Sequence, residues 1–224
     1  MKIGLVIADD YEYLPFLDFA KENGCTEGIS HGKQFVKFMY EGHELIAVKC
    51  GIGKVNAAVA AAYLISEENV DTIISFGLSG AVSGLIKNDI VVGTSYTECD
   101  FDLTALGYPK GVKPQDKYVY EADEKLLSAA LTLDGIKKAV CGCGDFFLTD
   151  KARRDEYIEL FGITEFDMET GAIARVCNES NVPFIAIRQI SDTADDMAAD
   201  SYTELNEQAT ATLTDAIAKF IKKI

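Results

Sequence analysis

Short apolar segments rich in β-branched residues alternate along the chain with segments whose apolar residues recur every three to four positions. The short segments have the length and composition of β-strands. We expect strands at Ile3–Ala8, Phe35–Tyr40, Leu45–Cys50, Thr72–Phe76, Ile90–Tyr96, Ala139–Cys143 and Phe184–Ile190. Helical spacing is found at Val55, Ala58, Val59, Ala62 and Ile65 and again at Leu126, Ala129 and Ala130. The alternation predicts an α/β fold in which helices cover a central sheet.

The segment from about Tyr202 to Lys222 predicts a long amphipathic closing helix. Its apolar residues in helical phase are Leu205, Ala209, Leu213, Ala216 and Phe220. No repeat, low-complexity tract or linker divides the sequence, so we expect residues 1–224 to form one domain. The least regular stretch runs from Cys99 to Ala122. A loop of this length in a compact domain is usually a lid, a subunit contact or disordered, and its aromatic residues favour an ordered role.

Composition narrows the possible partners. The chain has 224 residues, 48% of them hydrophobic, and a formal net charge of -15. This charge disfavours binding to nucleic acid or to anionic membranes. The apolar segment Met1–Ala8 is too short for a signal peptide, and no apolar run approaches the roughly 18 residues of a membrane span. A cytoplasmic protein is therefore expected.

The six cysteines show no C-x-x-C spacing, and the chain has only two histidines. Metal sites and disulfide frameworks need paired ligands. Buried reduced thiols are therefore expected, and neither a metal nor a cofactor is predicted.

Two glycine-rich motifs partly match known functional motifs, but each lacks residues that the function requires. Around Gly51–Val55, Val48 stands where a phosphate-binding loop has its first glycine, and Val55 stands where it has a Ser or Thr. Asn56 occupies the third glycine position of the dinucleotide-binding fingerprint. We therefore expect only a tight strand-to-helix turn here. Gly77–Ala81 resembles the nucleophile elbow of a serine hydrolase around Ser79. That architecture needs a histidine after the serine, whereas His31 and His43 both precede it.

Carboxylates near strand ends are the stronger candidates for chemistry. Asp167 and Glu169 stand where a short extended segment passes into a helix, Asp192 follows a buried strand, and Glu12 follows the first strand. Ligands of open α/β sheets bind at such strand ends. Each acid taken singly is more often a helix cap or first-turn residue than a catalyst, but acids at three corresponding strand ends weaken that explanation.

The chain resembles, over nearly its whole length, the purine nucleoside phosphorylase/nucleosidase superfamily, and within it the bacterial 5'-methylthioadenosine/S-adenosylhomocysteine nucleosidases. The resemblance lies in Glu12, Gly51–Ala58, Gly77–Ala81, Asn88–Val92, Asp102–Tyr108, Cys143–Phe147, Asp167–Ala174 and Arg188–Asp195. It implies a three-layer α/β/α fold with a mixed, partly barrel-like sheet, a homodimer, and hydrolysis of an adenosine-type nucleoside in methionine salvage.

The resemblance also implies residue roles. Asp192, beside Ser191, would protonate N7 of the purine, and Glu12 would activate water, with Asp9 or Asp10 as alternatives. Glu169 and Met168 would bind the ribose. The backbone around Phe147 and Leu148 would hold the base. The remaining expected substrate contacts are Ile52, Ser79 and Leu106, the last at a position that the partner subunit contributes to the 5'-substituent pocket in the family.

Water is favoured over phosphate as the nucleophile because phosphate needs fixed cationic donors, normally arginines. All four arginines of the chain lie after residue 152, whereas the phosphate ligands of the superfamily precede it. A phosphorylase and a nucleoside-binding protein without catalysis remain as alternatives. The sequence leaves the 5'-substituent open.

Overall fold

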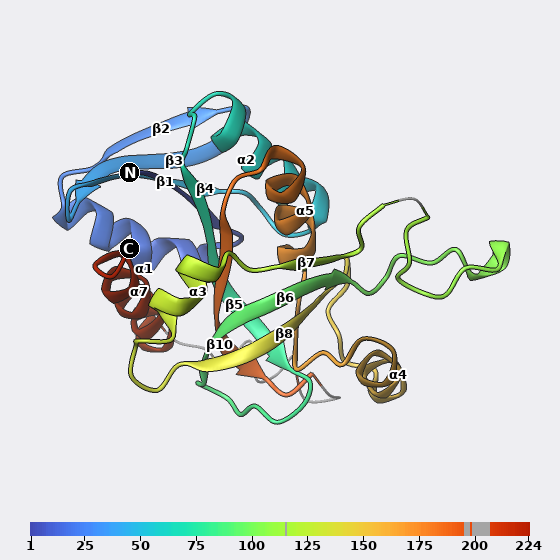
Figure 1. The fold of residues 1–224 in the computed structure, drawn as a ribbon. Helices are drawn as coiled ribbons and strands as arrows, with labels where there is room; N and C mark the ends of the chain where they lie inside the picture. The colour runs from blue at the N-terminus through green and yellow to red at the C-terminus, as the bar shows by residue number, and fades with distance from the viewer. Residues whose placement is uncertain (115, 195–197, 199–206) are drawn as a thin grey trace.

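The computed structural model describes residues 1–114, 116–194, 198 and 207–224. In this part of the chain the strands form one 10-stranded mixed sheet (Figure 1). The strands are β1 (Lys2–Ile7), β2 (Thr26–Ser30), β3 (Lys33–Tyr40), β4 (His43–Lys49), β5 (Thr72–Ala81), β6 (Ile90–Glu98), β7 (Val119–Glu121), β8 (Lys137–Cys143), β9 (Glu165–Asp167) and β10 (Phe184–Asp192).

Part of the sheet closes on itself. The strand order is β10-β6-β8-β9-β5-β1-β4-β3-β2, with β7 paired to β6. Because β10 pairs with β5 in parallel and with β6 antiparallel, the strands β5, β9, β8, β6 and β10 form a closed ring. The remaining strands extend from β5 as an open sheet that ends in the β3–β2 hairpin. The expected mixed, partly barrel-like sheet is thereby confirmed.

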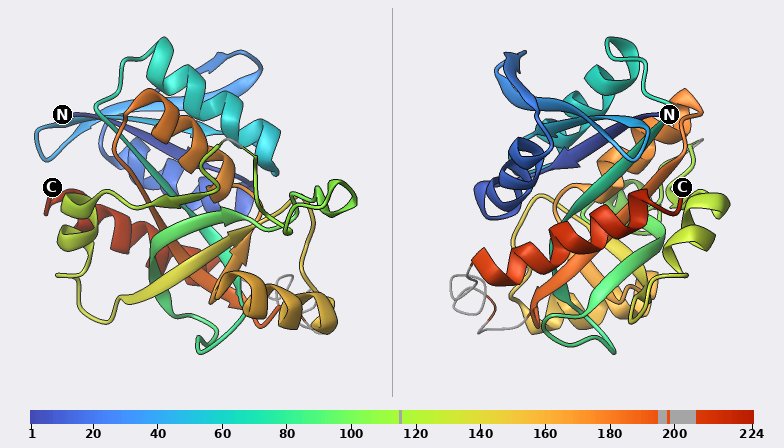
Figure 2. Two further views of the ribbon diagram at one scale, coloured as in Figure 1. Left: turned by 45° about the vertical axis from the view of Figure 1, so that its right-hand side comes forward. Right: turned by 90° about the vertical axis from the view of Figure 1, so that its left-hand side faces the viewer.

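Helices cover the sheet on both sides. They are α1 (Asp10–Glu22), α2 (Lys54–Ser66), α3 (Glu124–Ala130), α4 (Lys151–Phe161), α5 (Thr170–Ser180) and α7 (Glu207–Ile221), together with the 3-10 turn η1 (Thr104–Leu106). Helices α1 and α7 lie side by side on one face, and α2 and α5 pack together on the other (Figure 2). The expected start of the closing helix, Tyr202 and Leu205, lies outside the described residues.

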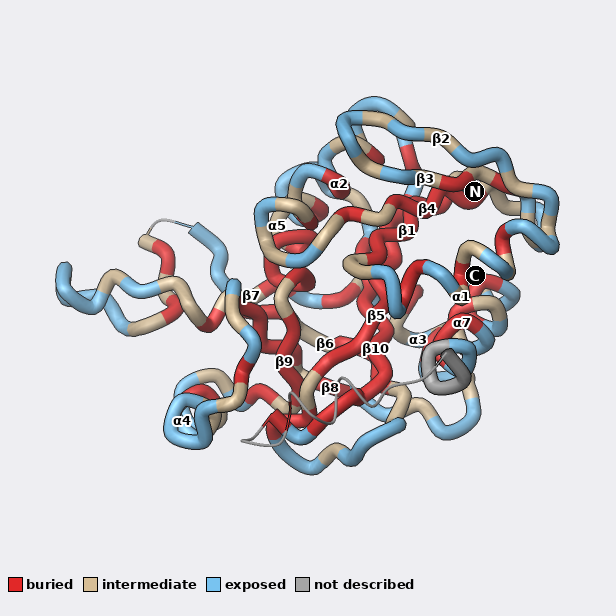
Figure 3. The backbone as a smooth tube through the Cα atoms, turned by 180° about the vertical axis from the view of Figure 1, so that it is seen from behind, coloured by how far each residue is buried: buried red, intermediate tan, exposed pale blue. Residues whose placement is uncertain are grey.

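The alternation of side chains along β1 explains why both faces need a cover. Leu5 belongs to the same buried cluster as Phe16 of α1 and Phe220 of α7, whereas its neighbour Val6 belongs to a second cluster with Leu64 of α2. A strand that is covered on both faces has a nearly continuous run of apolar residues in its sequence. The central strands are accordingly buried throughout, with exposed backbone confined to the periphery (Figure 3).

The seven expected strands are all present, but the interpretation of Gly77–Ala81 as a turn is wrong. These residues continue β5, and a Cβ at Gly77 would overlap the Glu12 carboxyl group. The glycine is needed for this close approach. Gly51 and Gly53, in contrast, do form a tight turn, with φ of 86° and 97°.

All six cysteines are unpaired, as expected, and all but the half-buried Cys25 are buried. None of the helices that the structure describes combines the length and the apolarity needed to cross a membrane.

Candidate active site

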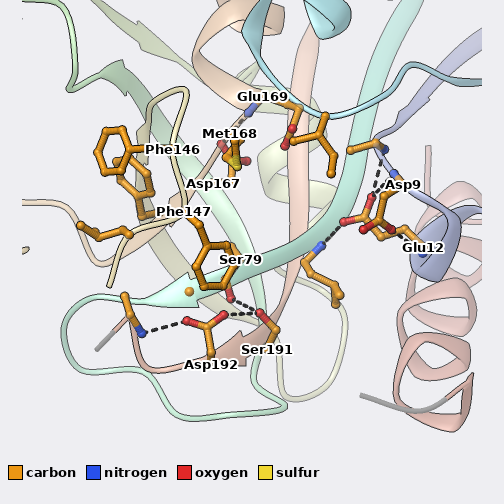
Figure 4. A pocket seen from close by; sticks show the side chains of 17 residues that line it. Asp9, Glu12, Ser79, Phe146, Phe147, Asp167, Met168, Glu169, Ser191 and Asp192 are labelled. Carbon is orange, nitrogen blue, oxygen red and sulfur yellow. Dashed lines mark hydrogen bonds between the residues drawn. The ribbon is translucent and has the colours of Figure 1, made fainter. Parts of the chain in front are cut away.

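A cavity opens where the carboxyl ends of β1, β5 and β10 meet β9 and the loop after β8. It contains about 910 Å³ of empty space, counting the part open to solvent. Its lining is Ala8, Asp9, Glu12, Ile52, Leu78, Ser79, Gly80, Phe146, Phe147, Leu148, Phe166, Asp167, Met168, Glu169, Ser191, Asp192 and Ala194. Nine of the ten expected site residues are therefore brought together, the exception being Leu106 (Figure 4).

Glu12 is both a helix-capping residue and part of the cavity wall. Asp9 caps α1 by accepting a hydrogen bond from the Glu12 amide, and Glu12 Oε2 accepts from the amides of Ala8 (3.0 Å) and Asp9 (3.2 Å). Its other oxygen accepts from the Leu78 amide at 2.7 Å. The capping box thus fixes the carboxyl group in the cavity wall, so the capping role of Glu12 is compatible with a role in the site.

Burial, and secondarily the charge of Asp9, raises the pKa of Glu12 to about 7, although the Leu78 amide and Arg188 oppose the shift. A carboxyl group with this pKa exchanges protons near neutral pH, as a general base must. Asp10, one of the two alternatives to Glu12, lies outside the cavity lining and pairs with Lys49 at 2.6 Å on the surface.

Glu169 stands at the start of α5 but does not cap it. Asp167 performs this task, since its Oδ1 accepts from the amides of Glu169 (3.2 Å) and Thr170 (3.1 Å). Glu169 Oε1 instead accepts from the Gly53 amide at 2.8 Å. The tight turn before α2 thus holds Glu169 in the cavity. Burial, and then the charges of Asp167 and Glu12, raise the pKa of Glu169 to about 8.

Arg188 lies beneath these acids and is 3% exposed. Its Nε donates to Asp167 Oδ2 and its Nη2 donates to Ser75 Oγ, each at 2.9 Å. Its positive charge opposes the raised pKa values of both Glu12 and Glu169. Arg188 is not among the residues that line the cavity, so it acts on the site from behind.

Asp192 ends β10 on the other side of the cavity. The Ser191 hydroxyl lies 2.6 Å from Asp192 Oδ2, and the Ala194 amide donates to Oδ1 at 2.9 Å. The backbone of Gly80 on β5 passes so close that a Cβ there would lie 2.8 Å from Oδ1. Asp192 is therefore held on two sides beside an apolar wall.

The loop after β8 forms this apolar wall. Phe146 packs against Phe166, with ring centroids 5.2 Å apart, and Arg153 lies 4.7 Å from the Phe146 ring centre. Phe147 is 43% exposed at the cavity mouth, and Leu148 is buried below it. A slot with aromatic walls and a few fixed polar groups suits a planar heterocycle.

The 3-10 turn η1, which ends at Leu106, belongs to an excursion of residues 99–114 and 116–118 that projects from the body of the molecule (Figure 1). Leu106 is 70% exposed and lines no part of this chain's cavity. The base of the excursion is fixed by ion pairs of Lys54 with Asp100 (2.6 Å) and of Lys113 with Glu98. Asp100 also accepts from the Asp145 amide at 3.0 Å, next to the Phe146 loop.

The sequence indicated Asp167 as a candidate acid without a specific role and did not indicate Arg188. An arginine inside an apolar strand was nevertheless a signal, because a buried charge needs a partner. The two histidines lie away from the cavity, with His31 in the β2–β3 turn and His43 at the start of β4.

The charge of the cavity limits its ligands. Five acidic side chains and no lysine, arginine or histidine stand among the described lining residues. Such a surface offers an anion no cationic partner, and those of its acids that are ionised stabilise positive charge that develops on a bound molecule. An apolar slot beside one fixed acid, with other acids across from it, suits acid–base cleavage of a bond to a heterocycle.

Known proteins share this architecture. A 5'-methylthioadenosine/S-adenosylhomocysteine nucleosidase of Bacillus subtilis is 37% identical over 211 residues, covering 91% of each chain. A Helicobacter pylori futalosine hydrolase mutant superposes with a TM-score of 0.95 at 26% identity over 100% of both chains. A Helicobacter pylori nucleosidase mutant with 5'-methylthioadenosine in its active site superposes with a TM-score of 0.94 at 27% identity, over 100% of this chain and 99% of the other.

The family model of the phosphorylase superfamily matches residues 2–224. With the match spanning nearly the whole sequence, the chain belongs to the phosphorylase superfamily.

Proposed function

We propose that this protein hydrolyses the N-glycosidic bond of a 5'-substituted adenosine and releases adenine. The curated relatives at 33–37% identity that cover the whole chain or most of it carry the name of such nucleosidases. A structural neighbour holds 5'-methylthioadenosine in its active site. The apolar slot between Phe147 and Asp192 is suited to the base of this compound.

Asp192 is the proposed acid. An adenine anion is a poor leaving group, and protonation at N7 removes its charge as the bond to C1' breaks. The Ser191 hydroxyl and the Ala194 amide fix the orientation of the Asp192 carboxyl group. The backbone around Phe147 and Leu148 would bind the edge of the base.

Glu12 and Glu169 would act on the sugar side. The ribose becomes oxocarbenium-like as the base leaves, and nearby carboxylates stabilise that charge. Glu169, beside Met168, would bind the ribose hydroxyls. Glu12, with its three backbone donors, would orient the attacking water and accept its proton.

The observation that carries the proposal is the absence of cationic side chains from the described cavity lining. Phosphate would have to enter among five acidic side chains without a cation to bind it, whereas water needs no such partner. Two cations close to the site motifs are held in ion pairs, Arg188 with Asp167 and Lys54 with Asp100.

The test is a screen of purified protein against 5'-methylthioadenosine, S-adenosylhomocysteine, 5'-deoxyadenosine, futalosine and inosine, with and without phosphate. Base release in phosphate-free buffer is expected from at least one 5'-substituted nucleoside. A rate that starts near zero and rises with phosphate would establish a phosphorylase instead. Binding without any release would indicate a nucleoside-binding protein.

Asp192→Asn should lower kcat by at least about 100-fold, which is the typical contribution of a positioned acid. The matched control is Asp123→Asn, which changes an acid that caps α3 away from the cavity. Retained turnover in the Asp192 variant would exclude its role as the acid.

We also propose a homodimer in which the excursion of residues 99–114 and 116–118 contacts a second copy. Leu106 and Tyr108 are 70% and 41% exposed on it, and Ile52 and Val55 are 53% and 75% exposed beside the cavity. No other described part of the chain covers the apolar residues of this excursion, and a second copy offers the apolar rim of its cavity. Analytical ultracentrifugation should give a dimer, and Leu106→Glu should weaken it, while a monomeric wild type would refute the proposal.

A further inference from the structure

An acid to which the proposed mechanism gives no direct role, Asp9, lies in the cavity wall directly before α1. It lines the cavity and is half-buried, so part of its surface is accessible. Figure 4 shows it beside Glu12, at the end of the cavity away from Phe146 and Phe147. Asp9 Oδ1 accepts a hydrogen bond from the Glu12 amide at 3.2 Å, which caps α1. The helix cap therefore fixes this carboxyl group at the sugar end of the cavity.

The proposed function leaves this end of the cavity to the 5'-substituent. With the base beside Phe147 and the ribose hydroxyls at Glu169, the 5'-carbon lies on the side of the sugar away from the base. The described lining residues at this end that bind neither the base nor the hydroxyls are Ala8, Asp9 and Ile52. Ile52, which is 53% exposed, offers an apolar surface to a carbon chain, and Asp9 offers a negative charge.

The charge of Asp9 acts on groups inside the cavity. It is the second cause, after burial, of the raised pKa of Glu12. The pKa values of Glu12 and Glu169 are raised to about 7 and 8, so both carboxyl groups are mostly protonated at pH 6. Asp167 is bonded to Arg188 behind the wall. At pH 6, Asp9 is therefore the main source of negative charge for a ligand group at the sugar end.

We infer that Asp9 is a specificity-determining residue that raises the preference for a positively charged 5'-substituent over a neutral one of the same shape, and lowers it for a carboxylate. The inference rests on the proposed function and names a substrate class within it, 5'-alkylthioadenosines whose alkyl chain ends in a primary amine. An ammonium group can donate a charge-assisted hydrogen bond to Asp9. A carboxylate meets a like charge there, and no lysine, arginine or histidine among the described lining residues binds it.

Three nucleosides of similar shape test the inference. They are the 5'-deoxyadenosines that carry a 2-aminoethylthio, a propylthio or a carboxymethylthio group at the 5'-carbon. The charge is separated from C1' by several bonds, so the intrinsic reactivity of the glycosidic bond is nearly the same in all three. Release of adenine is measured at pH 6 in phosphate-free buffer, and kcat/KM for each charged compound is divided by that for the propylthio compound.

Asp9→Asn removes the charge and keeps a side chain that caps a helix about equally well. It should lower the amine-to-propyl ratio of kcat/KM by at least about 5-fold, the effect of two unit charges about 4 Å apart in water, and should raise the carboxylate-to-propyl ratio. Asp10→Asn is the matched control and should leave both ratios unchanged, because Asp10 lies outside the described lining and pairs with Lys49 at 2.6 Å. Each ratio compares substrates of one protein, so a changed pKa of Glu12 cancels.

Ionic strength gives a second test that needs no variant. Raising it from about 0.01 M to about 0.15 M shortens the range of the attraction, so the amine-to-propyl ratio of the wild type should fall. If Asp9→Asn fails to fold, a ratio that does not respond to salt overturns the inference.

Equal ratios in the wild type and in folded Asp9→Asn would overturn the inference, and so would loss of all turnover in that variant, because Asp9 would then be the base. Cleavage of the propylthio compound with ratios unaffected by Asp9→Asn refutes this inference and leaves the proposed function intact. If the wild type releases adenine from none of the three compounds, the proposed function is refuted together with the inference.

Discussion

Removal of the Arg188 guanidinium tests whether one buried cation holds the acids of the cavity in place. Arg188→Met preserves much of the side-chain volume but removes three hydrogen bonds, two to Asp167 and Ser75 at 2.9 Å and one to the Ile187 carbonyl at 3.3 Å. Asp167 would keep its bonds to the start of α5 but would carry a buried charge without a counter-ion. Breaking a buried ion pair on one side typically costs about 3–5 kcal/mol.

For a chain of this size, each kcal/mol lowers the melting temperature by about 2–4 °C, so a decrease of roughly 6–20 °C is expected. Arg175→Met is the matched control, because Arg175 is 38% exposed and pairs with Asp116 and Glu179 at the surface. Each exposed pair contributes at most about 1 kcal/mol, so the loss of both corresponds to no more than about 8 °C.

Differential scanning calorimetry at one pH and protein concentration measures these shifts. Asp167→Asn in the Arg188→Met background removes the unpaired charge and should recover part of the lost stability. The pKa values of Glu12 and Glu169 should rise further in Arg188→Met, because Arg188 lowers both. Equal melting temperatures for Arg188→Met and Arg175→Met, or no recovery in the double variant, would refute the reasoning.

Three further predictions concern protons and the close approach of β5 to α1. In the wild type, kcat/KM should rise with pH up to about 7 as Glu12 loses its proton. Glu12→Gln should lower kcat by about 100-fold or more and should abolish that rise. An unchanged pH profile in this variant would exclude Glu12 as the base. Gly77→Ala should displace the Glu12 carboxyl group and lower kcat by about 100-fold with unchanged circular dichroism, and full activity would contradict the close contact. The pKa values of Glu12, Glu165 and Glu169 are raised from 4.5 to about 7, 7 and 8, so the folded protein binds these protons more tightly than the unfolded chain. The melting temperature should therefore fall as the pH rises from about 4.5 to about 8, Glu169→Gln should reduce the slope, and a slope unaffected by that variant would show that the shifts lie elsewhere.

The central strands could be predicted from sequence because burial on both faces leaves a continuous apolar run, as in β1. Strand β2 could not, since Thr26–Ser30 is an edge strand with little buried surface and no apolar alternation. Strands β7 and β9 have three residues each and exist through pairing with distant strands, which a local pattern does not contain. Helix α1 carries Pro15 in its interior, a residue that normally argues against a helix there. The closure of β10 onto both β5 and β6 was implied only by the family resemblance.

The site was predictable to the level of which strand ends carry acids, because parallel strands bring their carboxyl ends to one edge of a sheet. The sequence did not predict that Asp167 caps α5 while Glu169 lines the cavity. Both lie at the start of the same helix, and only the fold shows which of them accepts hydrogen bonds from its first amides. The roles assigned to all these residues stay predictions until variants are measured.

The ion pairs at the base of the excursion have a thermodynamic consequence. Asp100 bonds to Lys54, the first residue of α2, and to the Asp145 amide, while the Lys54 amide donates to Asp145 Oδ1 at 2.8 Å. The segment proposed to contact a second protomer and the loop proposed to hold the base thus share one set of polar contacts. If dimer formation orders these polar contacts, the nucleoside loses less binding free energy to ordering them itself, so its affinity is higher in the dimer. By linkage, the bound nucleoside must then raise the dimer's association constant by the same factor. Assembly and substrate affinity would then be two measurements of a single coupling free energy.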